Sequence, residues 1–165
     1  MAMAKAKKTK KVSPKISVKN LAACRQYVPL VSRWLWQQWD KRHNRTLKEI
    51  IYRTEHCLTK KCPQTLIAFY GAKPVGTVSL WKADHPYRQD LGPWLSCLLV
   101  LKKYRHLGIG QILQQELLKT AKRAGFKKVY LFTELKNYYE KSGWHFVETA
   151  IYTEGRKVGI YEYKL

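Results

Sequence analysis

One segment near the middle of the chain constrains the fold more than any other. An apolar run from Trp94 to Leu101 leads into a basic stretch with two glycines, Gly108 and Gly110, and then into a long helical pattern that ends at Gly125. A continuous apolar run of this length is typical of a buried strand. Glycine directly after a periodic segment is a helix stop signal. The predicted order is therefore strand, glycine-bearing turn and helix.

This helix is predicted to be amphipathic. Its apolar residues recur at intervals of three and four, as expected for a helix that packs on a core with one face. The apolar positions are Ile109, Ile112, Leu113, Leu117, Ala121 and Ala124, and the polar positions are Gln111, Gln114, Gln115, Lys119, Lys122 and Arg123.

The N-terminus of the helix predicts an anion-binding site. The first N–H groups of a helix lack carbonyl partners, and the positive end of the helix dipole lies there. Glycines let the backbone approach a ligand closely because they carry no Cβ, and Lys102, Lys103 and Arg105 add positive charge. The spacing is Arg-x-x-Gly-x-Gly, which is neither the dinucleotide-binding nor the Walker pattern. Taken alone, it also fits a tight turn without a ligand.

A second motif follows another strand-like run, Val129 to Phe132, and reads Tyr139-Glu-Lys-Ser-Gly-Trp144. With both motifs in this order, the chain resembles the GNAT superfamily of acetyl-CoA-dependent N-acetyltransferases. The segment Arg105-x-x-Gly-x-Gly110 is similar to the family's pyrophosphate loop, and the run from Pro93 to Leu101 is similar to the strand before it. The later motif is similar to the family's Tyr-x-x-x-Gly-Phe segment, with Trp in place of the usual Phe. The resemblance extends from about residue 16 to residue 165.

The other elements agree with the α/β (α+β) GNAT fold that this resemblance implies. Pro29 suits a first helical turn, Thr46 with Glu49 forms a capping-box signature, and glycine-containing turns predict two hairpins. We expect a mixed, mostly antiparallel, twisted sheet of about six to seven strands with about four helices on its faces. The run from Trp94, its helix and the run from Val129 form the one parallel crossover. The predicted strands are 15–19, 65–70, 75–80, 94–101, 129–132, 144–152 and 157–163, and the predicted helices are 29–40, 46–54, 109–124 and a short one that carries Tyr138, Tyr139 and Glu140.

The resemblance also implies a binding site for acetyl-CoA. In the family, the strand before the pyrophosphate loop splays from its parallel neighbour, and its exposed backbone pairs with the amides of the pantetheine arm. The same residues also fit an ordinary core strand, and both roles are compatible. The cofactor-binding residues implied are Leu99, Val100, Leu101, Arg105, His106, Leu107, Gly108, Ile109, Gly110, Gln111 and Asn137.

The catalytic groups are one tyrosine and an unassigned base. Tyr139 matches the family's general acid, since a phenol with a pKa of roughly 10 can protonate a thiolate whose own pKa is roughly 8.5. Tyr138 is the competing choice. Many family members carry an acid on the strand before the loop, but 94–101 contains none. Asp84, Asp90 and Glu134 lie near strand ends that should border the acetyl site, and His85 adjoins Asp84. Of these acids we name Asp84 and Asp90 as candidates for the base, although either also fits a plain loop residue.

Positive charge dominates the composition, with a net charge of +21 and a sequence pI near 10.0. Residues 1–14 are predicted to be a disordered basic tail that precedes a GNAT domain at 15–165. This tail fits a solvated segment or a weak contact with nucleic acid. The predicted function is acetyl transfer from acetyl-CoA to an amine of a small molecule or a protein. The alternative is a basic module, associated with nucleic acid or the ribosome, that keeps the fold without turnover.

The cysteine spacing and the hydropathy of the chain bear on metal binding, disulfides and cellular location. His56, Cys57 and Cys62 do not have the spacing of a metal site, and Cys24 and Cys97 suggest no disulfide framework. We therefore expect free thiols and no metal. No apolar run approaches the length of a membrane span, and no secretory signal is visible. The sequence predicts a cytoplasmic protein, monomeric or homodimeric, without a membrane partner.

Overall fold

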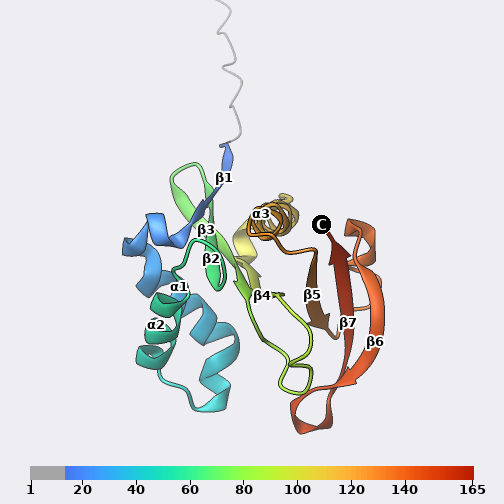
Figure 1. The fold of residues 1–165 in the computed structure, drawn as a ribbon. Coiled ribbons are helices and arrows are strands. Elements are labelled where there is room, and N and C mark those ends of the chain that lie inside the picture. The colour runs from blue at the N-terminus through green and yellow to red at the C-terminus, as the bar shows by residue number, and fades with distance from the viewer. Residues whose placement is uncertain (1–13) are drawn as a thin grey trace, which may run out of the picture.

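The computed structural model describes residues 14–165, so nearly all of the predicted basic tail lies outside the described residues. The described chain forms a seven-stranded sheet with the order β1-β2-β3-β4-β5-β7-β6 (Figure 1). All neighbouring strands pair antiparallel except β4 and β5, which are parallel. This confirms the predicted fold class and crossover. The strands are β1 Ile16–Asn20, β2 Gln64–Tyr70, β3 Lys73–Trp81, β4 Trp94–Val100, β5 Lys128–Thr133, β6 His145–Ile151 and β7 Lys157–Lys164.

Three α-helices accompany the sheet within residues 14–165: α1 Val28–Leu35, α2 Leu47–His56 and α3 Ile109–Arg123. The predicted capping box of α2 is present, since the Thr46 side chain accepts from the Glu49 N–H while the Glu49 carboxylate accepts from the Thr46 N–H. Helix α1 continues as a π-helical turn, Trp36–Asp40, which accounts for the predicted helix end near residue 40.

The expected fourth helix is a correction. The segment before β6 contains only a 3₁₀ turn, Glu140–Ser142. Asn137 has φ +57° and Gly143 has φ +86°, and both values interrupt a right-handed helix. The few residues between them can form one turn but not an α-helix. Tyr139 is therefore held in a tight loop.

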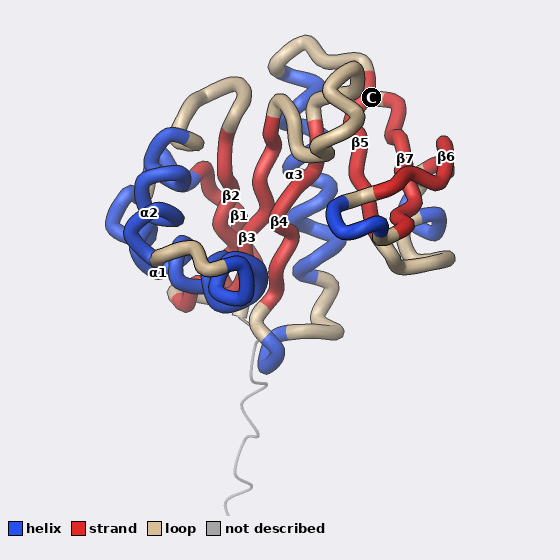
Figure 2. Tube along the Cα trace, turned by 90° about the horizontal axis from the view of Figure 1, so that it is seen from below, coloured by secondary structure: helices blue, strands red, loops and turns tan. Residues whose placement is uncertain are grey.

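The helices lie on opposite faces of the sheet. Figures 1 and 2 show α1 and α2 together on one side of strands β1–β4, with α3 on the other. Leu66 and Ala68 of β2 pack in the core beneath α3, whereas Ile67 and Phe69 pack against α1 and α2. Because successive strand residues point to opposite faces, this near-continuous apolar strand serves two cores. Burying each large side chain stabilises the fold by about 1.5–3 kcal/mol.

The parallel pair β4 and β5 is barely joined. The two strands share one residue pair, Trp94 with Tyr130, and the Tyr130 N–H donates to the Pro93 carbonyl at 2.9 Å. Strand β4 then continues to Val100 with only β3 as a partner, and the two strands move apart (Figure 2). A bulge in β4, where Cys97 has φ +55°, bends the strand here. Beyond Trp94, the edge of β4 that faces β5 is therefore open.

Candidate active site

The loop between β4 and α3 directs backbone N–H groups toward one spot. After a 3₁₀ turn at Lys102–Tyr104, His106 (φ +65°) and Gly108 (φ +75°) are left-handed, and Gly108 caps α3. The Ile112 N–H donates to the Gly108 carbonyl at 3.1 Å. The N–H groups of the helix residues before Ile112 therefore have no intrahelical acceptor and are free to bind an anion.

The two glycines of the loop have different physical roles. Gly108 needs its positive φ, so any side chain there would strain the backbone even though a Cβ would meet nothing within 4 Å. Gly110 lies within α3 and needs no special conformation, and a Cβ on it would meet only Val100 Cγ2, at an ordinary 3.9 Å. The fold does not require glycine at 110. Its effect is to leave the first turn of α3 uncovered.

The predicted backbone partners on β4 are not equivalent. The Leu101 N–H donates to the Val75 carbonyl at 2.9 Å, and its own carbonyl accepts from the Tyr104 N–H at 2.8 Å. Because alternate strand residues point their backbone groups to opposite edges, Val100 directs its N–H and C=O to the open edge, with Leu99 and Leu101 turned toward β3. The Val100 carbonyl accepts from Arg105 Nε at 3.1 Å. Arg105 thus fixes the end of β4 as well as adding charge.

Tyr139 and Tyr138 differ sharply in burial. Tyr139 is 9% exposed and meets Trp144 edge-to-face at 6.1 Å, whereas Tyr138 is 50% exposed. Burial is the larger cause, and the neighbouring Tyr138 the smaller one, of a rise in the pKa of Tyr139 to about 12. Tyr139 therefore stays protonated at neutral pH, and the same rise makes it a weaker acid than a free phenol. Asn137 lies just before it as an exposed, left-handed turn residue.

Gln114 was predicted on the polar face of α3, and the structure corrects this. Its side chain is buried, and Gln114 Oε1 accepts from Trp144 Nε1 at 3.2 Å. A buried indole N–H needs an acceptor, and the residue that provides it comes from another element. The hydrogen bond ties the loop that carries Tyr139 to α3.

Of the two candidate bases, the structure brings only Asp84 to β4. Ser96 Oγ donates to Asp84 Oδ2 at 2.6 Å, which places the carboxyl where β4 and β5 begin to separate. Burial raises the pKa of Asp84, although the Ser96 hydrogen bond and the charge of Arg53 oppose that rise. Asp90 is 61% exposed on its side chain and accepts two hydrogen bonds from Arg88, which lower the pKa of Asp90.

Aromatic side chains close the site beside Asp84. His85 is fully buried, with its ring 5.3 Å from Phe132, 5.6 Å from Tyr152 and 6.1 Å from Trp94. The Tyr87 N–H donates to His85 Nδ1, while Nε2 has no partner among the described residues. Burial, with the charge of Arg88, lowers the pKa of His85 and keeps its ring neutral. Adjacency to Asp84 was the only sequence signal, because the enclosing rings come from other elements.

Metal ligation and thiol chemistry find no support in the described residues. Across 14–165, no group of three or more His, Cys, Asp or Glu side chains could hold a metal ion, and all four cysteines are free thiols. Burial raises the pKa of Cys97 far above its ordinary value, which keeps this thiol protonated. Within the same range, no helix is both long enough and apolar enough to span a membrane.

Comparison with known proteins defines the class. The sequence profile of the acetyltransferase (GNAT) family matches residues 28–144. The chain therefore belongs to the GNAT acetyltransferase family, and it is an acyltransferase by that membership. The search of curated proteins found no significant match.

Solved structures share the fold at low sequence identity. An aminoglycoside 6'-acetyltransferase type Ii has a TM-score of 0.68 and 20% identity, over 91% of this chain and 96% of that one. A GNAT acetyltransferase from Streptococcus pneumoniae has a TM-score of 0.65 and 20% identity, over 92% and 100%. A putative streptothricin acetyltransferase from Bacillus anthracis, solved in complex with acetyl coenzyme A, has a TM-score of 0.57 and 20% identity, over 68% of each chain.

Proposed function

We propose that this protein transfers the acetyl group of acetyl-CoA directly to an amine, with Tyr139 as general acid and Asp84 as base. One observation carries the proposal: the open edge of β4 leads straight into the uncovered N-terminal turn of α3. These backbone groups have no strand or helix partner, an arrangement that suits an extended arm with amides that ends in a pyrophosphate. The structure with bound acetyl coenzyme A among the matches supports this choice of donor.

Each part of this arrangement has a role in binding. The N–H groups of Ile109, Gly110 and Gln111, with the loop 105–108, would hold the pyrophosphate. Val100 would pair with the pantetheine amides, and Leu99 and Leu101 would fix the strand on either side of it. Asn137 precedes Tyr139 by two residues in the chain. We therefore keep Asn137 in the proposed binding site as a residue that flanks the thioester end.

The transfer needs a base, a polarised carbonyl and an acid. Asp84 would accept a proton as the amine nitrogen attacks the thioester carbonyl, a role for which a raised carboxyl pKa is favourable. An N–H at the open edge of β4 would stabilise the oxyanion. As the C–S bond breaks, Tyr139 would protonate the departing thiolate. The products are the N-acetylated amine and CoA, and the proton lost by the amine balances the one given by Tyr139.

Asp90 is not needed in this scheme because its carboxylate is held by Arg88 at the surface. The acceptor is an amine of a small molecule or a protein, and the chain acts as a monomer or homodimer. We place the reaction in the cytoplasm, since reducing conditions preserve free thiols such as those found here.

Calorimetric titration with acetyl-CoA tests the binding half of the proposal. The wild-type protein should bind saturably, and Gly110→Trp should abolish binding because its side chain would cover the first turn of α3. Wild type that fails to bind would overturn the proposal.

An amine screen tests the chemical half. Tyr139→Phe should bind acetyl-CoA normally but lose about 10²–10⁴ in kcat. Tyr138→Phe is the matched control, since that ring lies at the surface. Equal kcat values in the two variants would reject Tyr139 as the acid.

A further inference from the structure

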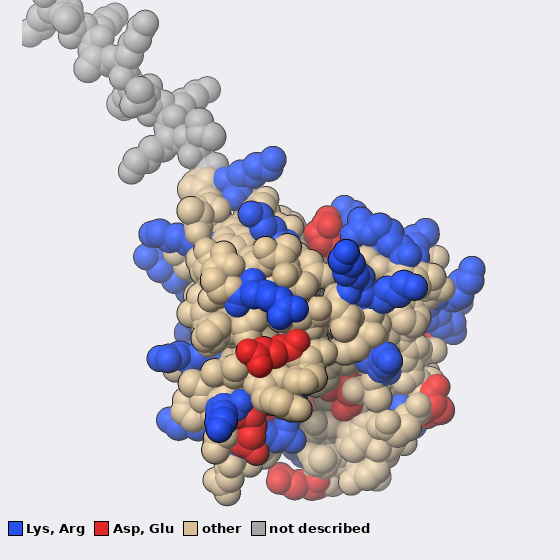
Figure 3. All heavy atoms as spheres, turned by 60° about the vertical axis from the view of Figure 1, so that its left-hand side comes forward, with Lys and Arg blue, Asp and Glu red and all other residues tan. Residues whose placement is uncertain are grey.

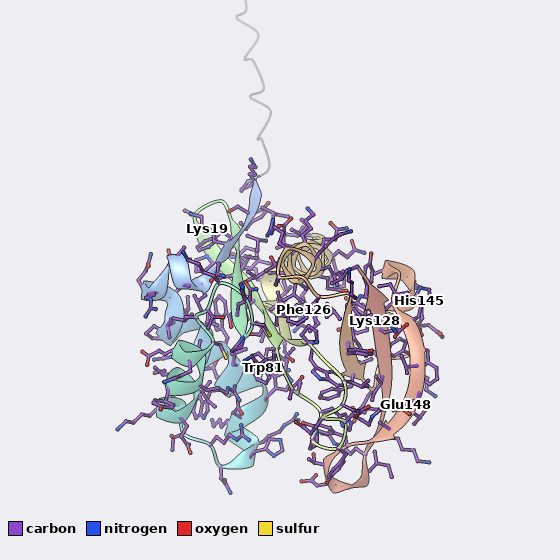
Figure 4. The ribbon with its side chains drawn as sticks, in the orientation of Figure 1. Lys19, Trp81, Phe126, Lys128, His145 and Glu148 are labelled. Atoms are coloured by element: carbon purple, nitrogen blue, oxygen red, sulfur yellow. The ribbon has the colours of Figure 1, made fainter. Side chains whose placement is uncertain are left out.

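A concave surface lies far from the candidate active site. A groove of about 570 Å³ runs at the edge of the sheet between β1 and the last turns of α3. Its floor is made of small or apolar side chains, and its rim carries cations. Figure 4 shows Lys19 at the β1 edge and Trp81 apart from it, at the end of β3. The floor residues are Val18, Ala22, Ala23, Leu66 and Ala124.

The cations of this groove come from three elements. Lys19 lies on β1, Lys60 and Lys61 lie on the loop before β2, and Arg123 lies on α3. All four side chains are exposed. The one acid at the groove, Glu116, is already paired with Lys119 at 2.8 Å. The rim therefore has a clear excess of positive charge.

The four cations of the groove have no acidic partner of their own. Within residues 14–165, none of them forms an ion pair with an acidic side chain, and the one acid of the groove is already paired. In the face that Figure 3 shows, Lys and Arg outnumber Asp and Glu in the upper part, and most of the acidic side chains in view lie in the middle and lower parts. Since like charges held close together repel, an anionic partner offsets this arrangement.

We propose that this groove binds a single strand of nucleic acid through its phosphates. The positive charge continues beyond the groove along α3, where Lys122 is exposed, so a linear polyanion longer than the groove is favoured. Asn20 and Gln64 are hydrogen-bonded to each other at 3.0 Å, which removes them as readers of base edges. Binding is therefore independent of sequence.

This site is separate from the acetyl-transfer site. The 15 residues of α3 place Arg123 about 20 Å along the helix from Gly108. That separation exceeds the screening length of roughly 8 Å at physiological salt. Changes at the groove should leave acetyl-CoA affinity unaltered.

Fluorescence anisotropy with a labelled single-stranded oligonucleotide of about 20 nucleotides, longer than a typical site of roughly 4–16, tests the proposal. The full chain is used throughout, so that residues 1–13 contribute equally to every variant. In the fourfold variant Lys19→Gln, Lys60→Gln, Lys61→Gln and Arg123→Gln, the slope of log K against log salt should fall by about 3, at roughly 0.7 per lost phosphate contact.

Two further variants keep the test sharp. The control Lys41→Gln, Arg42→Gln, Lys48→Gln and Lys157→Gln removes the same charge from exposed positions outside the groove and should keep nearly the wild-type slope. A version of the groove variant with Lys→Arg and Arg→Lys exchanges should bind as wild type does. Unchanged thermal unfolding would show that all variants are folded.

Three results would overturn the proposal. Equal losses in the groove variant and the control would mean that overall charge, and not the groove, attracts the strand. Absence of binding by the wild type would remove the function altogether. Tighter binding of poly-glutamate than of the oligonucleotide, lost in the groove variant, would assign the groove to an acidic protein segment instead.

Discussion

Replacing Gly110 by alanine should stabilise the protein and weaken its binding of acetyl-CoA at the same time. Gly110 has a helical backbone conformation, and an added Cβ would meet only Val100 Cγ2 at 3.9 Å. Alanine in a helix is favoured over glycine by about 0.5–1 kcal/mol. For a chain of this length, that gain corresponds to a rise in Tm of roughly 1–4 °C.

The same methyl group would project over the first turn of α3, where we place the pyrophosphate. Displacing a phosphate oxygen from one N–H would cost a charge-assisted hydrogen bond, about 1.5–3 kcal/mol. Acetyl-CoA should then bind roughly 10- to 150-fold more weakly. Thermal unfolding followed by circular dichroism and calorimetric titration measure the two effects on one protein sample.

Gly125→Ala is the matched control at the other end of α3. Gly125 has φ +90°, and a Cβ there would meet nothing within 4 Å. A left-handed alanine costs about 1–2 kcal/mol, so Tm should fall by roughly 2–8 °C while the affinity for acetyl-CoA stays unchanged. If Gly110→Ala binds acetyl-CoA as tightly as wild type, the pyrophosphate does not lie on this turn and the placement of the site is wrong.

Four other variants probe the acid–base groups, a buried hydrogen bond and a helix cap. Because the pKa of Asp84 is raised in the folded state, its ionisation destabilises the fold as pH rises above its ordinary value of about 3.9. The stability of Asp84→Asn relative to wild type should therefore increase with pH in urea unfolding, and a flat difference would contradict the raised pKa. Ser96→Ala removes the hydrogen bond that opposes this rise, so the acidic limb of the kcat/KM profile should move to higher pH. An unmoved limb would exclude Asp84 as the base. Trp144→Phe leaves the Gln114 amide buried and unpaired and should cost about 1–3 kcal/mol in urea unfolding, of which Gln114→Leu added to it should recover a part. Thr46→Ala should cost about 1 kcal/mol through the lost cap, and an unchanged unfolding midpoint would show that the capping box contributes nothing.

Local signals in the sequence predicted most of the fold. The turn glycines, the capping box at Thr46 and the stop at Gly125 each act within a few residues of themselves, so a single sequence displays them. The predicted strands agree with the observed ones to within a residue or two at their ends. The family resemblance then arranged these elements into the sheet that the structure shows.

Contacts between distant segments could not be read in the same way. Asp84 and Asp90 lie in one polar loop and look alike in the sequence, yet one is drawn to Ser96 and the other to Arg88. Gln114 fits the polar face of α3 by its spacing, but the indole of Trp144 captures it. The short helix expected around Tyr139 does not form because Asn137 adopts a positive φ. The residue types in this segment do not reveal that conformation.

Because only one residue pair joins β4 to β5, the sheet can flex between these two strands. Strands β1–β4 and strands β5, β7 and β6 form two hydrogen-bonded sets, and within residues 14–165 the only strand pairing between the sets is that of Trp94 with Tyr130. Helix α3 packs in one core with residues of both sets of strands and so holds the two sets together. A ligand bound along β4 would restrict the motion of β5 relative to β4. Amide hydrogen exchange should therefore slow at β5 and β7, while β2 and β3 keep their exchange rates. Binding of a ligand at β4 would then reduce the flexibility of the far strands of the sheet without any change of fold.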